Sequence, residues 1–400
     1  MTEPLTLLFL TSDVKGFAAM RAAKRLGCHT LLLARQKDQL ADWPRDSLDE
    51  VFFVPDLNDR RALLNAVSYL ARTRVIDHVF PLDDFEVVTA AVLREHLRLP
   101  GLGVSLAQHF RDKLAMRTVA QAAGLRVPAF APVFNHARLR AFLERGPGPW
   151  LLKPRSEASA MGIRRIDHPD AVWPLLEALG DEQSHFLVEQ YLPGEVSHVD
   201  ALVDNGEVVF EIASQYGRPP LDVYQGGGVF VTRTLDRAAP ATQALLDFNR
   251  QVLRALGLPR GAAHAEYIRA HADGQLYFLE GAARVGGANI AEAIEFATGV
   301  NLWAEWAALE IAALRGEPYP PPAARAGYAA VLNCLAQQEW PDLASYADPE
   351  VVWRLHKPFH AGLILASPDP ERVAALVAAY TPRFARDFLA VLPPLAKLSD

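Results

Sequence analysis

The sequence predicts an α/β protein in which a doubly wound N-terminal domain is followed by a two-part α+β core and a small C-terminal subdomain. Strand-like and helix-like segments alternate up to about residue 100, which is the rhythm of a parallel sheet. Short strands separated by Gly- and Asp-containing turns then run from Trp150 to about Arg315, as in an antiparallel sheet with covering helices. The Pro-rich run at residues 318–322 allows neither a helix nor a central strand, so it separates a final segment.

The N-terminal domain is expected at residues 1–112. Its predicted strands are Leu5–Leu10, Thr30–Leu33, Val51–Val54 and Val75–Phe80, and its predicted helices are Phe17–Leu26 and Asp59–Arg72. Asp83 and Asp84 follow the last of these strands at its carboxyl end. Ligands bind beyond the carboxyl ends of the strands in open α/β sheets, so we expect this edge to face a ligand.

The core is expected at residues 113–318. A helical pattern from Phe110 to Ala123 stops at Gly124, and an extended link to Pro128 opens the next unit. We expect the core to divide into a small lid subdomain at about residues 125–190 and a larger catalytic subdomain at about residues 191–318.

The C-terminal subdomain is expected at residues 319–400. It contains a predicted strand, Tyr328–Cys334, and a predicted helix, Pro370–Tyr380. The chain shows no internal repeat, which argues against a solenoid.

Composition limits the classes of function. Of the 400 residues, 50% are hydrophobic and 22% are charged, so the chain can bury more than one core. The net charge of -7 gives no general attraction for nucleic acid or an anionic membrane. No stretch approaches the roughly 20 uncharged apolar residues that cross a bilayer. The apolar run Leu5–Leu10 lacks the basic leader of a secretory signal, and the two cysteines form no CxxC or zinc-ligand cluster. We therefore expect a cytoplasmic protein without nucleic-acid or membrane partners.

Two lysines and a small-residue loop form the first candidate site. Lys113 follows Arg111-Asp112, and Lys153 ends an apolar strand that begins at Trp150. Either lysine alone would often be a solvated surface residue, since lysine is rarely buried unpaired. The loop Ser156–Gly162, with hydroxyls at Ser156 and Ser159, is short on bulky residues and could close over an anion. Taken alone, this loop also fits a plain hairpin turn.

A hinge-like segment follows the loop. The apolar strand Phe186–Glu189 runs into Pro193-Gly194, with the carboxylates of Glu189 and Glu195 on either side. The order of a lysine before the linker, a lysine-proline strand end with its loop, and this hinge resembles the ATP-grasp superfamily of ligases, particularly its biotin carboxylase-like branch. The resemblance covers about residues 5–370 and implies a pre-ATP-grasp domain, an ATP-grasp core, and ATP with Mg2+ as cofactors.

The resemblance also implies roles for individual residues. It implies that Lys113 and Lys153, with the loop hydroxyls of Ser156 and Ser159, bind the phosphates of ATP. It also implies that Glu189 and the backbone near Tyr191 and Leu192 bind adenine, and that Glu195 binds the ribose. A carboxylate suits the ribose because it accepts from two hydroxyls. His198 is a further candidate for the nucleotide site, although a lone histidine in a strand is more often a satisfied structural residue.

Two strand-borne carboxylates make the candidate metal site. Glu266 and Glu280 are separated by a turn at Asp273-Gly274, so an antiparallel hairpin would bring them together. Adjacent carboxylates repel each other unless a cation lies between them, and magnesium with ATP phosphates is a suitable cation. The alternative, two charges on a solvated hairpin face, is disfavoured by their largely apolar neighbours.

Arg284 and Ala282 follow the second carboxylate. The resemblance places at Arg284 an arginine that stabilises the developing charge on an acyl phosphate. Many family members carry an asparagine where this chain has Ala282, as a further magnesium ligand. The number of metal ions is therefore open, with Asn289 or water as substitutes.

Substrate recognition is expected in the segment Ser214–Thr232, which reads as a long irregular loop. Arg218, Tyr224 and Arg233 are candidates to meet a substrate carboxylate. The other interpretation of this segment is a mobile connection.

These patterns predict an ATP- and Mg2+-dependent carboxylate-amine ligase that forms an amide through an acyl phosphate. The expected substrates are a small-molecule carboxylate, such as an amino acid, and an amine, and a homodimer is left open. Two alternatives remain: a ligase that activates bicarbonate, and a regulatory protein that binds ATP without catalysis.

Overall fold

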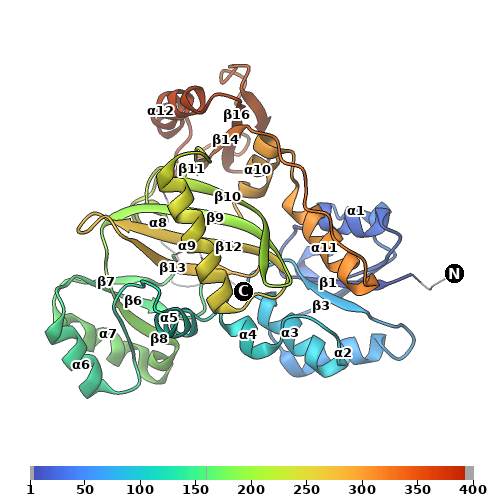
Figure 1. Cartoon of the computed structure of the whole chain (residues 1–400), viewed down its shortest axis with the longest axis horizontal. Coiled ribbons are helices and arrows are strands. Elements are labelled where there is room, and N and C mark those ends of the chain that lie inside the picture. Colours follow the sequence, from blue (N-terminus) through green and yellow to red (C-terminus); the bar gives the residue numbers. More distant parts are fainter. Residues whose placement is uncertain (1–3, 159, 392–400) are drawn as a thin grey trace.

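The computed structural model describes residues 4–158 and 160–391, and Ser159 therefore lies outside the described residues. The chain is arranged around three sheets, which Figure 1 shows as an N-terminal lobe, a lid lobe and a central body that extends to the C-terminal segment. None of the described helices is both long and apolar enough to cross a membrane.

The N-terminal sheet has four parallel strands in the order β3-β2-β1-β4. Its strands are β1 (Thr6–Thr11), β2 (His29–Arg35), β3 (Glu50–Val54) and β4 (His78–Pro81), and its helices are α1 (Phe17–Arg25), α2 (Arg60–Leu70) and α3 (Glu86–Leu97). The predicted alternation of strands and helices and the parallel sheet are confirmed. Strand β1 is buried along its whole length because helices cover both faces.

Helices α4 (Val104–Gln108) and α5 (Lys113–Ala122) lead into the lid. Helix α5 begins at Lys113 because the Asp112 side chain accepts from the backbone N–H groups of Leu114 and Ala115. The Lys113 N–H donates to the carbonyl of Arg155 (2.8 Å), so the start of this helix is fixed to the end of a lid strand.

The lid is a four-stranded antiparallel sheet in the order β5-β8-β6-β7, with its own hydrophobic core. Its elements are β5 (Phe130–Pro132), α6 (His136–Arg145), β6 (Trp150–Pro154), β7 (Arg164–Ile166), α7 (Val172–Leu179) and β8 (Phe186–Gln190). The entering and leaving segments lie side by side, since the Gln190 N–H donates to the carbonyl of Ala129 (2.7 Å).

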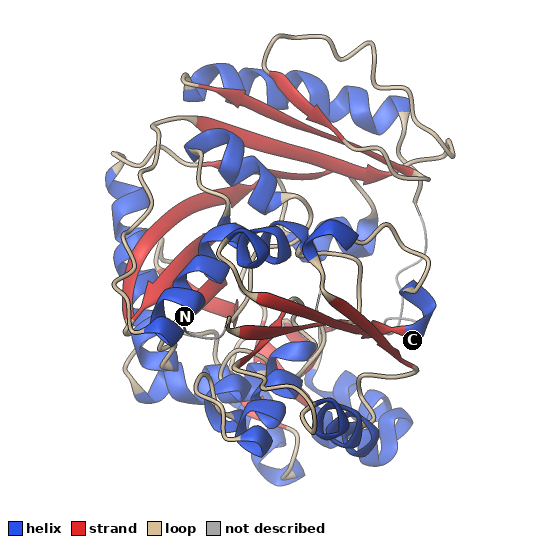
Figure 2. Cartoon of the chain, turned by 90° about the vertical axis from the view of Figure 1, so that its right-hand side faces the viewer, coloured by secondary structure: helices blue, strands red, loops and turns tan. Residues whose placement is uncertain are grey.

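The central sheet has eight antiparallel strands in the order β13-β12-β9-β10-β11-β14-β16-β15. Its strands are β9 (Gly194–Asp204), β10 (Glu207–Tyr216), β11 (Phe230–Thr234), β12 (Gly261–Ala270), β13 (Leu276–Ala282), β14 (Tyr328–Leu335), β15 (Val351–Arg354) and β16 (His360–Ser367). Its helices are α8 (Pro220–Gly226), α9 (Pro240–Leu256), α10 (Ile290–Thr298), α11 (Leu302–Arg315) and α12 (Pro370–Asp387). Figure 2 shows the strands of the chain with helices packed around them.

Two parts of this sheet differ from the sequence-based expectation. The sequence predicts one strand in the C-terminal subdomain, but β14, β15 and β16 all continue the central sheet, so the boundary at residue 318 remains a proposed division. The segment Ser214–Thr232 is not one irregular loop. Strand β10 reaches Tyr216, and α8 follows because Pro219-Pro220 presets the backbone for a helix start.

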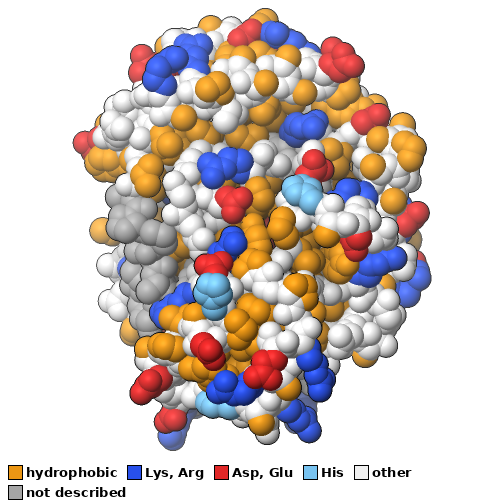
Figure 3. Space-filling model, turned by 90° about the vertical axis from the view of Figure 1, so that its left-hand side faces the viewer, with side chains coloured by type: hydrophobic (Ala, Val, Ile, Leu, Met, Phe, Trp, Pro, Cys, Tyr) orange, Lys and Arg blue, Asp and Glu red, His pale blue; other side chains and the backbone are white. Residues whose placement is uncertain are grey.

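The N-terminal lobe and the central body share a hydrophobic core. Helix α1 packs on α11, and the rings of Phe80 and Trp306 lie 4.2 Å apart between centroids. On the left-hand face of the molecule in Figure 1, acidic and basic side chains are interspersed with hydrophobic ones (Figure 3). The charge on this face is therefore mixed in sign.

Candidate active site

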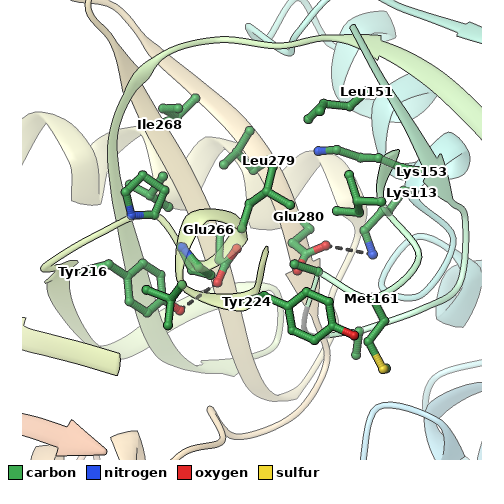
Figure 4. Close-up of a pocket in the computed structure, with 18 of the residues that line it drawn as sticks. Lys113, Leu151, Lys153, Met161, Tyr216, Tyr224, Glu266, Ile268, Leu279 and Glu280 are labelled. Atoms are coloured by element: carbon green, nitrogen blue, oxygen red, sulfur yellow. Dashed lines mark hydrogen bonds and ion pairs between the residues drawn. The ribbon is translucent and has the colours of Figure 1, made fainter. Parts of the chain in front are cut away.

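The main cavity lies between the lid and the central sheet and has a volume of about 410 Å³. Figure 4 shows Lys113 of α5 joined by a dashed line to Glu280 of the central sheet, with Lys153 of the lid nearby. Among the described residues, Asp84 is the one member of the N-terminal domain that lines it. The cavity therefore sits where all three parts of the chain meet.

The two candidate metal ligands lie directly opposite each other. Strands β12 and β13 pair antiparallel, and Glu266 is in register with Glu280, as the predicted hairpin requires. The turn at Gly274 adopts a positive φ of 68°, which glycine tolerates. Glu266 is half-buried and Glu280 is part-exposed, and both line the cavity. The pair places carboxylate oxygens of two strands on one wall, a donor set suited to magnesium.

Lys113 bridges the lid and the metal-site wall. Its Nζ lies 2.8 Å from Oε2 of Glu280 and donates to the carbonyl of Glu157 at 2.6 Å. Burial acts to raise the pKa of the Glu280 carboxyl, but Lys113 and more distant cations lower it to about 2. Glu280 is therefore ionised at neutral pH, as a metal ligand must be.

Lys153 belongs to a buried ionic triad. The Glu189 carboxylate is 1% exposed and accepts from Lys153 Nζ on one oxygen and from Arg117 Nε (3.0 Å) and Nη2 (2.8 Å) on the other. Burial acts to raise the pKa of Glu189, but Arg117 and Lys153 lower it below its usual range. The predicted adenine contact of Glu189 is thus left to its backbone, because its side chain is engaged with these two cations.

Glu266 is held by two neighbours. The hydroxyl of Tyr216 donates to its Oε1 at 2.7 Å (Figure 4), and Nε2 of His264 lies 3.8 Å from the same oxygen. His264 Nδ1 contacts Asp200 Oδ1 at 2.9 Å. Burial acts to lower the pKa of His264, but the Asp200 carboxylate raises it to about 9. A second layer of polar side chains therefore fixes this wall.

Arg284 lines the cavity as expected and links it to the N-terminal sheet. Its Nη2 lies 3.3 Å from Asp84 Oδ2, and its Nη1 donates to the carbonyl of Val285 at 2.9 Å. Arg284 lies in the bend after β13 and lines the same cavity as Glu280. Burial acts to lower the pKa of its guanidinium, but the carboxylates of Asp84, Asp83 and, after them, Glu280 raise it. The guanidinium is thus close to the metal-site wall.

Several predicted residues lie away from the cavity. Glu195 is exposed and, by strand alternation, faces away from the cavity-lining Val196, so we do not retain its assignment to ribose. His198 is fully buried between Asp200 (2.7 Å) and Thr232 (2.7 Å) and does not line the cavity, and these contacts favour the alternative of a satisfied structural histidine.

Of the remaining residues predicted to contact ATP or the substrate, some line the cavity and others do not. Ser156 is exposed outside the cavity, while its loop neighbours Glu157 and Met161 line it. Neither Arg218 nor Arg233 lines the cavity. Arg218 is exposed and donates to the carbonyl of Gly227 (3.4 Å), and Arg233 donates to the side chain of Gln215 (3.3 Å). Tyr224 on α8 does line it, as do Tyr191 and Leu192 of the hinge.

Ala282 is buried opposite His264 in the β12/β13 register. Asn289, the proposed substitute ligand, starts α10 and accepts from Asn333 Nδ2 (3.3 Å), and it does not line the cavity. The described residues of this wall therefore supply two acidic ligands without an amide from position 289.

Sequence reasoning missed Arg117, Asp200, Tyr216 and His264 as parts of the site. Arg117 had one available signal, since it lies one helical turn after Lys113 and must share its side of the helix. The other three come together only through strand pairing, which the sequence pattern did not specify.

Comparison with known proteins finds similarity to an ATP-grasp domain and to an amino acid ligase. The family model for the ATP-grasp N-terminal domain matches residues 20–101. The L-arginine-specific L-amino acid ligase of Bacillus subtilis is 27% identical over 262 residues, which are 64% of this chain and 62% of that protein. The chain thus matches less than two thirds of that relative's length.

Solved structures show the same fold over nearly the whole chain. An L-amino acid ligase from Bacillus licheniformis superposes with a TM-score of 0.75 at 18% identity, covering 98% of this chain and 99% of that one. A biotin carboxylase from Campylobacter jejuni, solved as a β-γ-ATP complex, gives 0.71 at 15% identity, covering 97% and 92%. These structures show that the chain has the fold that the resemblance to the ATP-grasp superfamily implied.

Proposed function

We propose that this chain, which has the ATP-grasp fold, is an ATP- and Mg2+-dependent ligase that joins the carboxylate of an amino acid to an amine. The observation that carries the proposal is the facing pair Glu266 and Glu280, with Lys113 and Lys153 directed into the same cavity. The similarity to an L-amino acid ligase supports an amino acid as the activated acid.

The residues present fit both ATP and magnesium. The hinge residues Tyr191 and Leu192 line the cavity together with the apolar side chains of Leu151 and Ile268, a lining that suits a flat base. The cations Lys113 and Lys153 suit the phosphates, and the opposed carboxylates suit a hard divalent ion. When bound, ATP supplies the transferable phosphoryl group, and magnesium neutralises charge on the phosphates.

In the proposed reaction a carboxylate oxygen of the acid attacks the γ-phosphorus and ADP leaves, which gives an acyl phosphate. The amine nitrogen then attacks the acyl carbon, phosphate leaves with the bonding electrons, and the nitrogen loses a proton. Arg284 lies on the metal-site wall and is the residue suited to stabilise charge on the acyl oxygen and phosphate. The lid residues over Lys113 would limit hydrolysis by excluding water.

The test is a release assay for ADP and phosphate with a panel of amino acids, alone and in pairs. We expect turnover that depends on an acid and an amine together, and loss of at least about 100-fold in the variant Glu280→Gln. Glu195→Gln, which changes an exposed carboxylate away from the cavity, serves as a matched control and should retain wild-type turnover. Turnover stimulated by bicarbonate without an organic acid, or tight ATP binding with no turnover, would overturn the proposal.

A further inference from the structure

Asp84 is a buried carboxylate at the boundary between the N-terminal sheet and the main cavity. It follows β4 at the carboxyl end, is 8% exposed, and lines the cavity beside Arg284. The proposed activity uses the lysines, the glutamates and Arg284, but it gives Asp84 no role beyond the contact with Arg284.

The hydrogen bonding of Asp84 is incomplete. Its Oδ2 lies 3.3 Å from Arg284 Nη2, while its buried Oδ1 has no hydrogen-bond partner among the described residues. Arg284 Nε is likewise buried without a partner in the described part of the chain. Buried polar atoms are normally satisfied, and each exception calls for an explanation such as a ligand or an ion. The two atoms without hydrogen-bond partners, called orphan atoms below, therefore belong to the two residues of one ion pair, Asp84 and Arg284, and both residues line the cavity.

The neighbouring charges do not supply the missing donor. Lys15, in the loop after β1, pairs with the neighbouring Asp83. The guanidinium of Arg111 lies over the ring of Phe85, 4.5 Å from its centroid. Glu86 is a further buried carboxylate, and neither it nor Asp83 lines the cavity. Lys15 and Arg111 therefore have other partners, and Arg284 is the cation that contacts Asp84 among the described residues.

The pattern of orphan atoms indicates the chemistry of the missing partner. The Oδ1 atom accepts hydrogen bonds, and a cationic donor would satisfy both this bond and the charge of the carboxylate. The Arg284 Nε donates and calls for an anionic oxygen. A ligand with an ammonium group and a carboxylate on one carbon atom supplies both at once. An α-amino acid is such a ligand, and its carboxylate would lie at the arginine beside the metal-site wall.

We propose that Asp84 binds the α-ammonium group of the amino acid whose carboxylate is activated, and so selects α-amino acids over acids that lack the amine. The inference rests on the ligase activity proposed above and adds a specificity-determining residue to it. The activated amino acid keeps its free ammonium group and becomes the amino-terminal part of the product.

The competing explanation is that Asp84 only holds Arg284 in place. The variant Asp84→Asn separates the two roles, because the amide oxygen still accepts from Arg284 while the negative charge is lost. A residue that only anchors Arg284 affects every acid equally. A residue that binds ammonium affects only acids that carry one.

The experiment measures acyl-phosphate formation with hydroxylamine as the amine, which traps the acid as its hydroxamate. The best amino acid of the panel is compared with the same acid lacking the α-amino group, for example L-leucine with 4-methylpentanoate. For Asp84→Asn we expect kcat/KM for the amino acid to fall by about 10- to 100-fold, the range of a charge-assisted hydrogen bond. The value for the amine-free acid should stay within about threefold, and Asp84→Glu should recover part of the loss.

Asp83→Asn is the matched control, since it removes the adjacent carboxylate that pairs with Lys15 outside the cavity. It should leave the ratio between the two acids unchanged. Equal losses for both acids in Asp84→Asn would overturn the assignment while leaving the ligase activity intact. Absence of hydroxamate from the wild type with every acid would overturn the proposed function and, with it, this inference.

Discussion

The buried triad of Lys153, Glu189 and Arg117 allows a quantitative test of how the lid is held to the body. We consider Glu189→Gln, which keeps the size of the side chain and removes its charge. Arg117 is 0% exposed and Lys153 is 9% exposed, so the substitution leaves two buried cations without a counter-charge. Breaking a buried ion pair in this way destabilises a protein strongly, whereas replacing both partners does not.

The size of the effect follows from the geometry. At the 2.8 Å between Arg117 Nη2 and Glu189 Oε2, two unit charges attract by about 6 kcal/mol at an effective dielectric constant of about 20. Burial offsets part of this attraction, and measured losses for such changes are about 3–5 kcal/mol. We expect the free energy of unfolding to fall by about that amount.

The assay is urea denaturation across a range of pH. The folded-state pKa of Glu189 is lowered from 4.5, so its stabilising effect is fully present above that value. The effect is lost as the pH falls through the lowered folded-state pKa. The difference between wild type and Glu189→Gln should therefore be constant near neutral pH and shrink below about pH 4.5.

Two controls make the outcome decisive. Glu195→Gln, an exposed change six residues later, should alter the free energy of unfolding by less than about 0.5 kcal/mol. Adding Arg117→Met to Glu189→Gln should restore part of the stability, because it removes one uncompensated cation. A loss below about 1 kcal/mol at neutral pH, or a difference independent of pH down to pH 3, would refute this reasoning.

Two further predictions concern the polar layer behind the metal-site wall. Tyr216→Phe removes the hydroxyl that donates to Glu266, so the Mg2+ concentration for half-maximal turnover should rise by about 10- to 100-fold, and an unchanged Mg2+ dependence would contradict this role. Gly286→Ala places a Cβ 2.5 Å from Asp200 Oδ1 and 3.1 Å from His264 Nδ1, so it should lower the free energy of unfolding by about 1–3 kcal/mol. Gly287→Ala, whose Cβ meets nothing within 4 Å, is the matched control in the same denaturation experiment, and equal losses in both variants would count against a clash at Asp200.

Local patterns were sufficient to predict most of the fold. The apolar run Leu5–Leu10 and the amphipathic helix after it predicted the parallel sheet, because period and turn residues report local structure directly. The pairing of Glu266 with Glu280 was predictable because a short turn fixes the register of a hairpin.

Such local patterns do not predict which strands pair when they lie far apart in the sequence. Strand β14 pairs with β11 across nearly a hundred residues, so the C-terminal strands could not be assigned to the central sheet. The same limit explains Glu195, because adjacent strand positions face opposite sides and only the pairing of β9 with β12 shows which side faces the cavity. His198 shares the side of the cavity-lining Val196, but the rings of Tyr216 and His264 pack against it, and the sequence pattern did not predict these contacts. Asp200 and His264 are brought together by that pairing as well.

The hydrogen bond between Gln190 and Ala129 has a consequence for how the lid behaves as a unit. Both chain crossings into the lid pass through one short stretch of paired backbone, and the lid buries its apolar side chains among themselves. A rotation about that double crossing leaves the strands of the central sheet intact, although it must carry α5 with the lid or break the contacts of Lys113 and Arg117. Amide hydrogens of β6 and β8 should then exchange with solvent as one cooperative group, at a rate separate from that of β9 and β12.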